Sequence, residues 1–135
     1  MRTSGSCLCK AVKFSFDIAE KHFNSCHCKM CRVWGGGPAM VVESAGGIEF
    51  ESEEELALYD SSKWAERGFC KKCGSHLFYR LKNHPYCNFN LGTLDNDQEF
   101  TFKTQFYIDI KPHNYAFSNE TKTMTEEEVM AAFNS

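Results

Sequence analysis

The stretch SCLCKAVKFSFDI, residues 6–18, joins two closely spaced cysteines to a run of alternating apolar and polar residues. The apolar side of this run consists of Val12, Phe14, Phe16 and Ile18. Alternation with a period of two is typical of a β-strand that buries one face. The stretch therefore predicts a strand that follows directly after a pair of potential metal ligands.

Short runs of the same kind recur along the chain, separated by turn-forming Gly, Asn, Asp and Lys residues. These runs read GGIEFES, ELALYD, HLFYRL, YCNFNL and QEFTFKTQFYIDI. Because the connections are generally too short for crossover helices, we expect most neighbouring strands to be antiparallel. The sequence therefore predicts a mainly β protein built of antiparallel β-sheets.

The C-terminus is the exception to this β pattern. Thr125 precedes the run EEEVMAAF. Glu128, within this run, stands three positions after Thr125, which is the spacing of a capping box. Acidic residues at the start of a helix are also stabilised by the helix dipole. We therefore expect a short C-terminal helix whose apolar side packs on the sheet through Val129, Ala132 and Phe133.

Length and composition limit the classes of protein to consider. The chain has 135 residues, of which 42% are hydrophobic, so a single domain spanning residues 1–135 is expected. The formal net charge is −3 and the basic residues are scattered, which argues against nucleic-acid or membrane binding. The sequence shows no signal peptide and no long apolar run, so we expect a soluble, cytoplasmic protein.

Seven of the eight cysteines fall into tight C-x-C and C-x-x-C groups. Disulfides within such short segments close strained rings, whereas zinc readily accepts closely spaced thiolates. Without a secretion signal, this grouping favours metal binding over a framework of disulfides.

Cys7 and Cys9 would point the same way on an extended backbone and would supply half of a metal site. The segment CKKCG, residues 70–74, has the form of a zinc knuckle, with Gly74 where the turn requires a positive φ. Cys70 and Cys73 would supply the other half. Four thiolates close the coordination sphere, so we predict a structural zinc site.

The segment CHCKMC, residues 26–31, holds Cys26, Cys28 and Cys31. Three sulfurs at this spacing can meet at one zinc ion and leave its fourth position open, as in catalytic zinc sites. Three thiolates weaken zinc as a Lewis acid, so binding of an external thiol is favoured over activation of water. A thiolate formed in this way could add to an electrophile such as an aldehyde.

Two other interpretations of this cysteine triad stay open. The segment could be packed without a metal, or a protein side chain could close the site: Cys87, His22, His27, His76, His84 or His113. A closed site would favour a zinc module that binds a protein partner. On an extended backbone the ring of His27 would point away from the metal, and Cys87 is expected to be a buried, inert thiol rather than a redox nucleophile.

Four motifs resemble those of the glutathione-dependent formaldehyde-activating enzyme family, which also includes centromere protein V. In chain order they are GSCLCKAVKF, CHCKMCRVWGG, YDSSKWAERGFCKKCGSHLF and LGTLDN, and they cover roughly residues 5 to 96. The resemblance implies a zinc-stapled fold of coiled β-sheets with a structural ion held by Cys7, Cys9, Cys70 and Cys73. It also implies a second zinc ion at Cys26, Cys28 and Cys31, where glutathione acts.

The activity implied by this resemblance is that of a carbon–sulfur lyase, which adds glutathione to formaldehyde to give S-hydroxymethylglutathione. Arg32 follows the triad and could bind a glutathione carboxylate through its planar guanidinium. The chain departs from the family where it has Gln105-Phe106-Tyr107 and later Tyr115, because the family usually has a His-aromatic pair and then a Trp there. This difference leaves the substrate open.

Overall fold

The structure is a computed structural model that describes residues 1–133, and this part of the chain contains eleven β-strands and two α-helices. The prediction of a mainly β protein with a short C-terminal helix is confirmed. The chain forms two compact units, one made of residues 1–21 and 42–100 and the other of residues 22–41 with those from Thr101 onward. Because both units are built from separate segments, the single domain over residues 1–135 stays a prediction.

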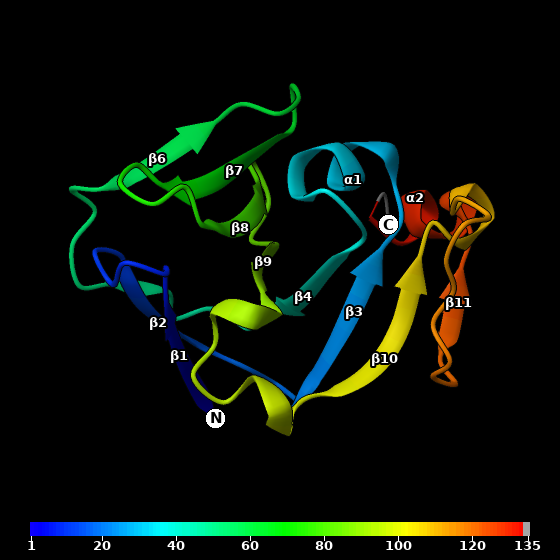
Figure 1. Ribbon diagram of the computed structural model, residues 1–135, viewed down its shortest axis with the longest axis horizontal. Helices are drawn as coiled ribbons and strands as arrows, with labels where there is room; N and C mark the ends of the chain where they lie inside the picture. The colour runs from blue at the N-terminus through cyan, green and yellow to red at the C-terminus, as the bar shows by residue number, and fades with distance from the viewer. Residues whose placement is uncertain (134–135) are drawn as a thin grey trace. The chain divides into compact units, whose positions relative to one another are not determined.

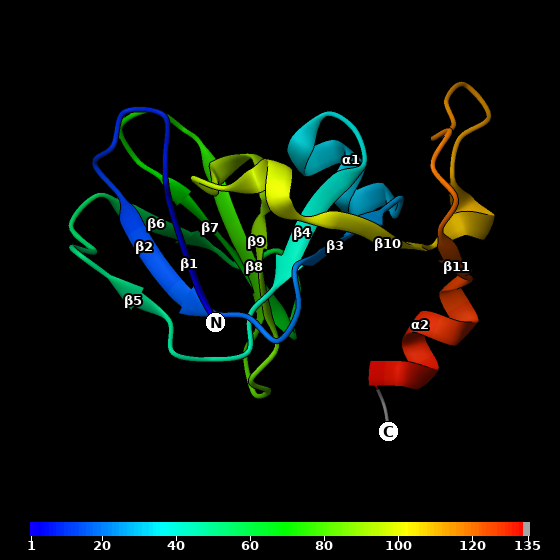
Figure 2. The ribbon, with the colours of Figure 1, turned by 90° about the horizontal axis from the view of Figure 1, so that it is seen from below.

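The first unit contains two groups of strands and two short 3-10 helices. Its elements are β1 (Arg2–Ser6), β2 (Lys13–Asp17), β5 (Glu49–Phe50), β6 (Leu56–Tyr59), β7 (Ala65–Cys70), β8 (His76–Leu81), β9 (Cys87–Asn90), η1 (Leu91–Thr93) and η2 (Asp97–Glu99). One group has the order β1-β2-β5 and the other the order β9-β8-β7-β6, with antiparallel neighbours throughout. Figure 1 labels β1, β2, β6, β7, β8 and β9, and Figure 2 also labels β5.

An aromatic core joins the two groups of strands in the first unit. Phe14 and Phe16 are buried on the apolar side of β2, as the alternation in the sequence predicts. The ring centroids of Phe16 and Phe89 lie 4.3 Å apart and those of Phe14 and Phe89 lie 4.6 Å apart. Phe50 and Phe78 complete the cluster, with their centroids 5.8 Å apart. Stacked contacts with Phe89 and tilted contacts with Phe78 therefore hold the three-stranded sheet against β9 and β8.

The second unit contains four strands, two helices and a 3-10 helix. Its elements are β3 (His22–Cys26), α1 (Lys29–Gly35), β4 (Ala39–Glu43, which continues into the first unit), β10 (Thr101–Phe106), η3 (Ile108–Ile110), β11 (Lys122–Met124) and α2 (Glu126–Phe133). The strand order is β11-β10-β3-β4. Figure 1 shows β3, β10 and β11 side by side, with α1 following β3.

Two strand pairs in the second unit are parallel, unlike the antiparallel pairing expected for most neighbours. β10 pairs in parallel with both β3 and β11, while β3 and β4 are antiparallel. Parallel neighbours require long connections, and the chain between β3 and β10 is long because it passes through the first unit. β10 and β11 are joined by residues 107–121, a connection that is also long but stays in the second unit. The other strand pairs described above are antiparallel, so the expectation for most neighbours is confirmed.

The last predicted strand is shorter than its sequence pattern. The run QEFTFKTQFYIDI forms β10 only as far as Phe106, and η3 follows. Tyr107 adopts a left-handed backbone conformation with φ 60°, which a strand cannot continue through. The strand therefore ends where this residue turns the chain.

The predicted capping box of α2 is present. Thr125 Oγ1 accepts a hydrogen bond from the Glu128 N–H at 3.2 Å, and Glu128 Oε1 accepts one from the Thr125 N–H at 3.0 Å. The predicted packing of the apolar side is correct only in part, because Val129 is buried while Ala132 and Phe133 are exposed.

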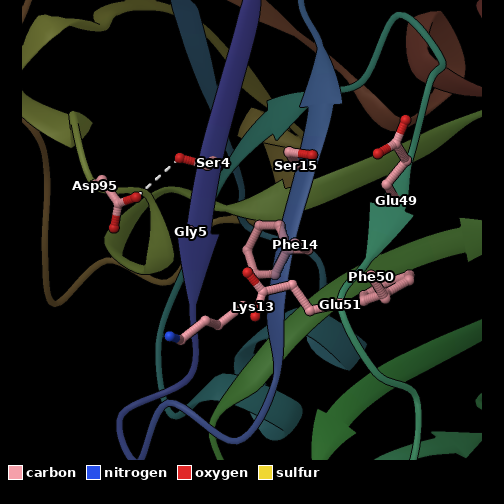
Figure 3. A pocket seen from close by; sticks show the side chains of 9 residues that line it. All are labelled: Ser4, Gly5, Lys13, Phe14, Ser15, Glu49, Phe50, Glu51 and Asp95. Carbon is pink, nitrogen blue, oxygen red and sulfur yellow. Dashed lines mark hydrogen bonds between the residues drawn. The ribbon is translucent and has the colours of Figure 1, made fainter.

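One hollow of about 370 Å³ lies in the first unit beside β1, β2 and β5 (Figure 3). Its lining includes the charged residues Lys13, Glu49, Glu51 and Asp95 and the ring of Phe14. The Ser4 hydroxyl donates a hydrogen bond to Asp95 Oδ2 at 2.9 Å. Within residues 1–133 no helix is long and apolar enough to cross a membrane.

Candidate metal centres

Cys7, Cys9, Cys70 and Cys73 form a compact cluster of sulfurs in the first unit. All four Sγ atoms lie within 4.8 Å of one another, with 3.6 Å between Cys7 and Cys9 and 3.8 Å between Cys9 and Cys70. Zinc–sulfur bonds of about 2.3 Å around a tetrahedron place neighbouring sulfurs about 3.8 Å apart. The donor set and its spacing therefore fit a zinc ion with four thiolate ligands.

The pair Cys7 and Cys9 lies on a turn, which corrects the expectation of an extended backbone. The Cys7 N–H donates to Val12 O at 3.0 Å, and the Lys10 N–H donates to Cys7 O at 3.2 Å. Lys10 has a positive φ of 69°. In a strand, residues two apart are separated by about 6.6 Å, so only a turn brings these two sulfurs to 3.6 Å.

Ser75 connects the two halves of this cluster. Its hydroxyl lies 3.1 Å from Cys73 Sγ and accepts a hydrogen bond from the Leu8 N–H at 3.0 Å. Hydrogen bonding from Ser75 lowers the pKa of Cys73 to about 5, because it stabilises the thiolate. Gly74 has φ 77°, as the knuckle spacing predicted. The loop after Cys70 is thus shaped to present sulfur ligands.

Cys26, Cys28 and Cys31 form a second cluster, which lies in the second unit and which we call the cysteine triad. Their Sγ atoms all lie within 4.8 Å of one another. Cys26 is the last residue of β3, and Cys28 is the N-cap of α1, where its sulfur accepts a hydrogen bond from the Cys31 N–H at 3.4 Å. The end of a strand and the first turn of a helix therefore bring the three sulfurs together.

The cysteine triad suits a soft divalent cation. Hydrogen bonding with Cys28 and Cys31, together with burial, raises the pKa of the Cys26 thiol strongly. Three sulfurs this close cannot all become thiolates without a neighbouring positive charge. Zinc would supply that charge, and three thiolates are among its usual protein ligands.

His27 lies between two members of the triad but its ring is used elsewhere. The side chain is buried, with Nε2 2.8 Å from Gln105 Oε1 and Nδ1 2.7 Å from the Tyr115 hydroxyl. Burial lowers the pKa of His27, because the charged ring would lose its hydration. With both ring nitrogens occupied, His27 is not placed to be the fourth ligand of the triad.

The remaining candidate ligands do not join the triad within the part of the chain that the structure describes. The group of closely spaced donors there has three members, and it does not include the other candidates, Cys87, His22, His76, His84 and His113. Cys87 is buried in β9, as expected, and burial raises its pKa to about 12. A thiol with so high a pKa is a poor redox nucleophile at neutral pH.

Arg32 follows the triad on α1, and its Nε donates a hydrogen bond to the backbone carbonyl of His27 at 2.9 Å. A guanidinium has five N–H donors, so this bond uses one of them. Arg32 is half-buried, so part of the residue stays in contact with solvent.

Sequence reasoning did not assign Gln105 and Tyr115 to the surroundings of the triad. The signal in the sequence was the departure of these two positions from the family pattern. The structure adds that Gln105 is a polar residue at a buried position of β10. Their partner could not be identified, because the two residues lie 78 and 88 positions from His27.

Comparisons with known proteins show which family and which fold this chain resembles. A family model described as glutathione-dependent formaldehyde-activating enzyme matches residues 2–110. An uncharacterized lyase of Schizosaccharomyces pombe is 38% identical over 128 residues, which cover 93% of this chain and 93% of the lyase. A protein of Halomonas elongata, provisionally named as a glutathione-dependent formaldehyde-activating enzyme, is 32% identical over 89 residues, or 58% of this chain and 55% of that protein. The fold is shared with a crystal structure of a Rhodobacter sphaeroides protein, with a TM-score of 0.59 at 22% identity over 73% of this chain and 97% of that chain.

Proposed function

The chain belongs to the glutathione-dependent formaldehyde-activating enzyme family, and from that premise we propose that it is a zinc-dependent carbon–sulfur lyase. The proposed reaction adds a thiol of the glutathione type to formaldehyde or to a related small electrophile. The proposed catalytic residues are Cys26, Cys28 and Cys31, which hold the metal at which the thiol binds. We assign a separate, structural zinc ion to Cys7, Cys9, Cys70 and Cys73.

One observation carries this proposal: the closely spaced donors at the triad number three in the described part of the chain. Zinc in proteins usually has four ligands, so a three-donor site can accept a ligand from outside. A four-cysteine site has no such position, which explains why the two clusters receive different roles.

The zinc ion, when bound, would lower the pKa of an incoming thiol and hold it as a thiolate at neutral pH. The sulfur lone pair then forms a bond to the aldehyde carbon, and the carbonyl π electrons move to oxygen. The thiol releases its proton to solvent, the alkoxide oxygen takes up one proton from solvent, and the product is a hemithioacetal with an S-hydroxymethyl group. Cys26, Cys28 and Cys31 would hold the zinc ion and would thereby fix the position of the attacking sulfur.

Arg32 is the residue we propose for binding the substrate's carboxylate. Its Nε is occupied by the His27 carbonyl, and the terminal N–H groups of a guanidinium are arranged to bind a carboxylate through two parallel hydrogen bonds. Glutathione carries two carboxylates and one thiol. A thiol that lacks a carboxylate should therefore bind more weakly.

The test is the rate of exchange between glutathione-bound and free formaldehyde, followed by exchange spectroscopy with ¹³C-labelled formaldehyde. Formaldehyde and glutathione also react spontaneously, so the exchange rate is measured at equilibrium with and without protein. The enzymatic contribution is the increase in this rate that the protein causes. We expect Cys28→Ser to reduce the enzymatic acceleration by at least about a hundredfold, as loss of a ligand weakens metal binding.

Cys87→Ser is the matched control, because Cys87 is a cysteine outside both clusters. It should keep the acceleration. Equal exchange rates with the wild-type protein, with Cys28→Ser and without protein would contradict the lyase proposal and would favour a zinc module without enzymatic activity.

A further inference from the structure

His27 is held by contacts from two separate segments of the second unit. Besides its two ring contacts, its backbone N–H donates to Phe106 O at 3.1 Å, and its backbone carbonyl accepts from Arg32 Nε. The residue is completely buried, and its ring centroid lies 5.8 Å from that of Phe117. These contacts leave His27 little freedom to rotate.

The hydrogen bonds determine which ring nitrogen carries the hydrogen. Gln105 Nε2 donates to Thr121 Oγ1 at 3.0 Å, so the amide presents its oxygen, an acceptor, to the ring. His27 Nε2 is therefore the donor, and Nδ1 accepts the hydrogen bond from the Tyr115 hydroxyl. The Tyr115 hydroxyl therefore donates to His27, His27 donates to Gln105, and Gln105 donates to Thr121.

The covalent neighbours of His27 are two of the three triad cysteines. Side chains alternate in direction along extended backbone, so Ser25 and His27 share one side of the chain while Cys26 faces the other. The Ser25 hydroxyl lies 3.4 Å from His27 Nε2, which agrees with this alternation. Any rotation of His27 about the backbone would therefore displace Cys26 and Cys28 from their shared centre.

We propose that His27 is the positioning residue of the cysteine triad. Gln105 and Tyr115 fix the His27 ring by their hydrogen bonds and thereby set the metal affinity of the triad. The proposal rests on the proposed function only in requiring that the triad binds a metal. It assigns two residues from the C-terminal part of the chain to a site whose ligands all lie within residues 26–31. It also explains why His27 is buried without being a ligand.

Tyr115→Phe is the most direct test, because it removes one hydroxyl and leaves the ring. We expect the zinc dissociation constant of the triad to rise by about 10- to 100-fold, which is the usual effect of changing a residue that orients a metal ligand. The affinity is measured by competition with a chromogenic chelator. The four-cysteine site should keep its affinity and serves as an internal reference.

Gln105→Leu and Gln105→Glu form a second pair of variants. Leucine removes the acceptor that His27 Nε2 requires, whereas glutamate keeps an oxygen acceptor at the same distance from the backbone. We expect the zinc affinity of the triad to fall in Gln105→Leu and to be largely restored in Gln105→Glu. In the cobalt-substituted protein, the visible absorption bands of the triad should shift in Gln105→Leu and Tyr115→Phe, which reports ligand geometry directly.

Tyr86→Phe is the matched control for Tyr115→Phe. Its hydroxyl accepts a hydrogen bond from Asn88 Nδ2 at 3.0 Å in the first unit, so the substitution also removes one hydrogen-bonded phenol hydroxyl, away from the triad. It should leave the triad unchanged. Should it weaken the triad as much as Tyr115→Phe does, the specific role of Tyr115 is wrong.

The proposal is overturned if the triad of Tyr115→Phe and Gln105→Leu binds zinc as tightly as the wild-type triad. It is also overturned if both metal sites weaken equally, because the residues then act on general stability, or if the wild-type protein binds one ion only. Failure of the lyase function gives a different result. In that case the variants lose zinc affinity as expected, but wild-type protein does not accelerate formaldehyde exchange.

Discussion

At Gly5, on β1, the structure has no room for a side chain. A Cβ atom there would overlap the carbonyl oxygen of Thr93 and would lie 2.9 Å from the ring of Phe14. The backbone at Thr93 cannot move aside without disturbing the bridge between Gly5 and Leu94. A single methyl group at this position therefore has a large structural effect.

We predict that Gly5→Ala lowers the free energy of unfolding by about 1–3 kcal/mol, the usual cost of overpacking a filled site. Gly92→Ala is the control, because a Cβ at Gly92 would meet no atom within 4 Å apart from those of its own helix and chain neighbours. Urea unfolding of both variants gives the comparison. Similar losses of stability in the two variants would refute the steric explanation.

A second prediction concerns the thiol of Cys87. Burial raises its pKa to about 12, so its thiolate fraction at pH 8 is about a thousandfold lower than that of a thiol with the ordinary value of about 9. We expect iodoacetamide to modify Cys87 of the zinc-loaded protein at least about a thousandfold more slowly than in urea. Mass spectrometry of the peptide that contains Cys87 measures both rates, and rapid labelling of the folded protein would show that the thiol is accessible and ionised.

At the scale of elements, the C-terminal helix depends on its capping box. Thr125→Ala removes the side-chain acceptor for the Glu128 N–H, and loss of a cap typically costs about 1 kcal/mol. We predict that hydrogen exchange of the amides in α2 becomes about fivefold faster, while exchange in β2 is unchanged. Ser118→Ala, at an exposed loop position, is the control and should change neither.

The helices and strands also show which elements the sequence pattern predicts correctly and which it does not. The alternation in β2 and the capping box of α2 are local signals, and both predicted their elements correctly. The end of β10 could not be predicted, because Tyr107 takes up a conformation that its own residue type does not favour. Helix α1 has only seven residues, fewer than the roughly 11 needed to recognise a helical pattern, and its start at the cysteine triad is equally consistent with a turn.

In the candidate sites, too, local sequence signals predicted correctly, and features that depend on the tertiary fold could not be predicted. The grouping of cysteines was sufficient to assign seven of them to two clusters, and the structure brings together the members of each cluster as predicted. The extended backbone expected at Cys7 and Cys9 was wrong, since only a turn shortens their separation enough. The partners of His27 could not be found either, because pairing over 78 and 88 positions depends on the tertiary fold.

At the scale of the whole molecule, the four-cysteine cluster connects residues 61 positions apart in the first unit. Closing a loop of that length costs about 4 kcal/mol of chain entropy. Structural zinc contributes about 10–16 kcal/mol, which exceeds this cost and is comparable to the total stability of a typical domain, about 5–15 kcal/mol. The first unit should therefore need its metal to stay folded.

We predict that Cys73→Ser, or removal of zinc with a strong chelator, unfolds the first unit. Cys28→Ser should keep the fold, because the triad ties together only residues 26–31. Circular dichroism and the aromatic proton spectrum, which reports the Phe core, distinguish these states. If both substitutions unfold the protein, or neither does, the assignment of one structural and one open site is wrong.

The central claim is that the cysteine triad binds a metal with three protein ligands and accepts a thiol as the fourth. The most direct measurement is the absorption spectrum of protein that carries zinc at the four-cysteine site and cobalt at the triad, titrated with glutathione. We predict that the thiolate-to-cobalt charge-transfer intensity rises by about one third, from three sulfur ligands to four, and saturates. A cobalt spectrum that already has the intensity of four thiolates, or that does not change at any glutathione concentration, would contradict the claim.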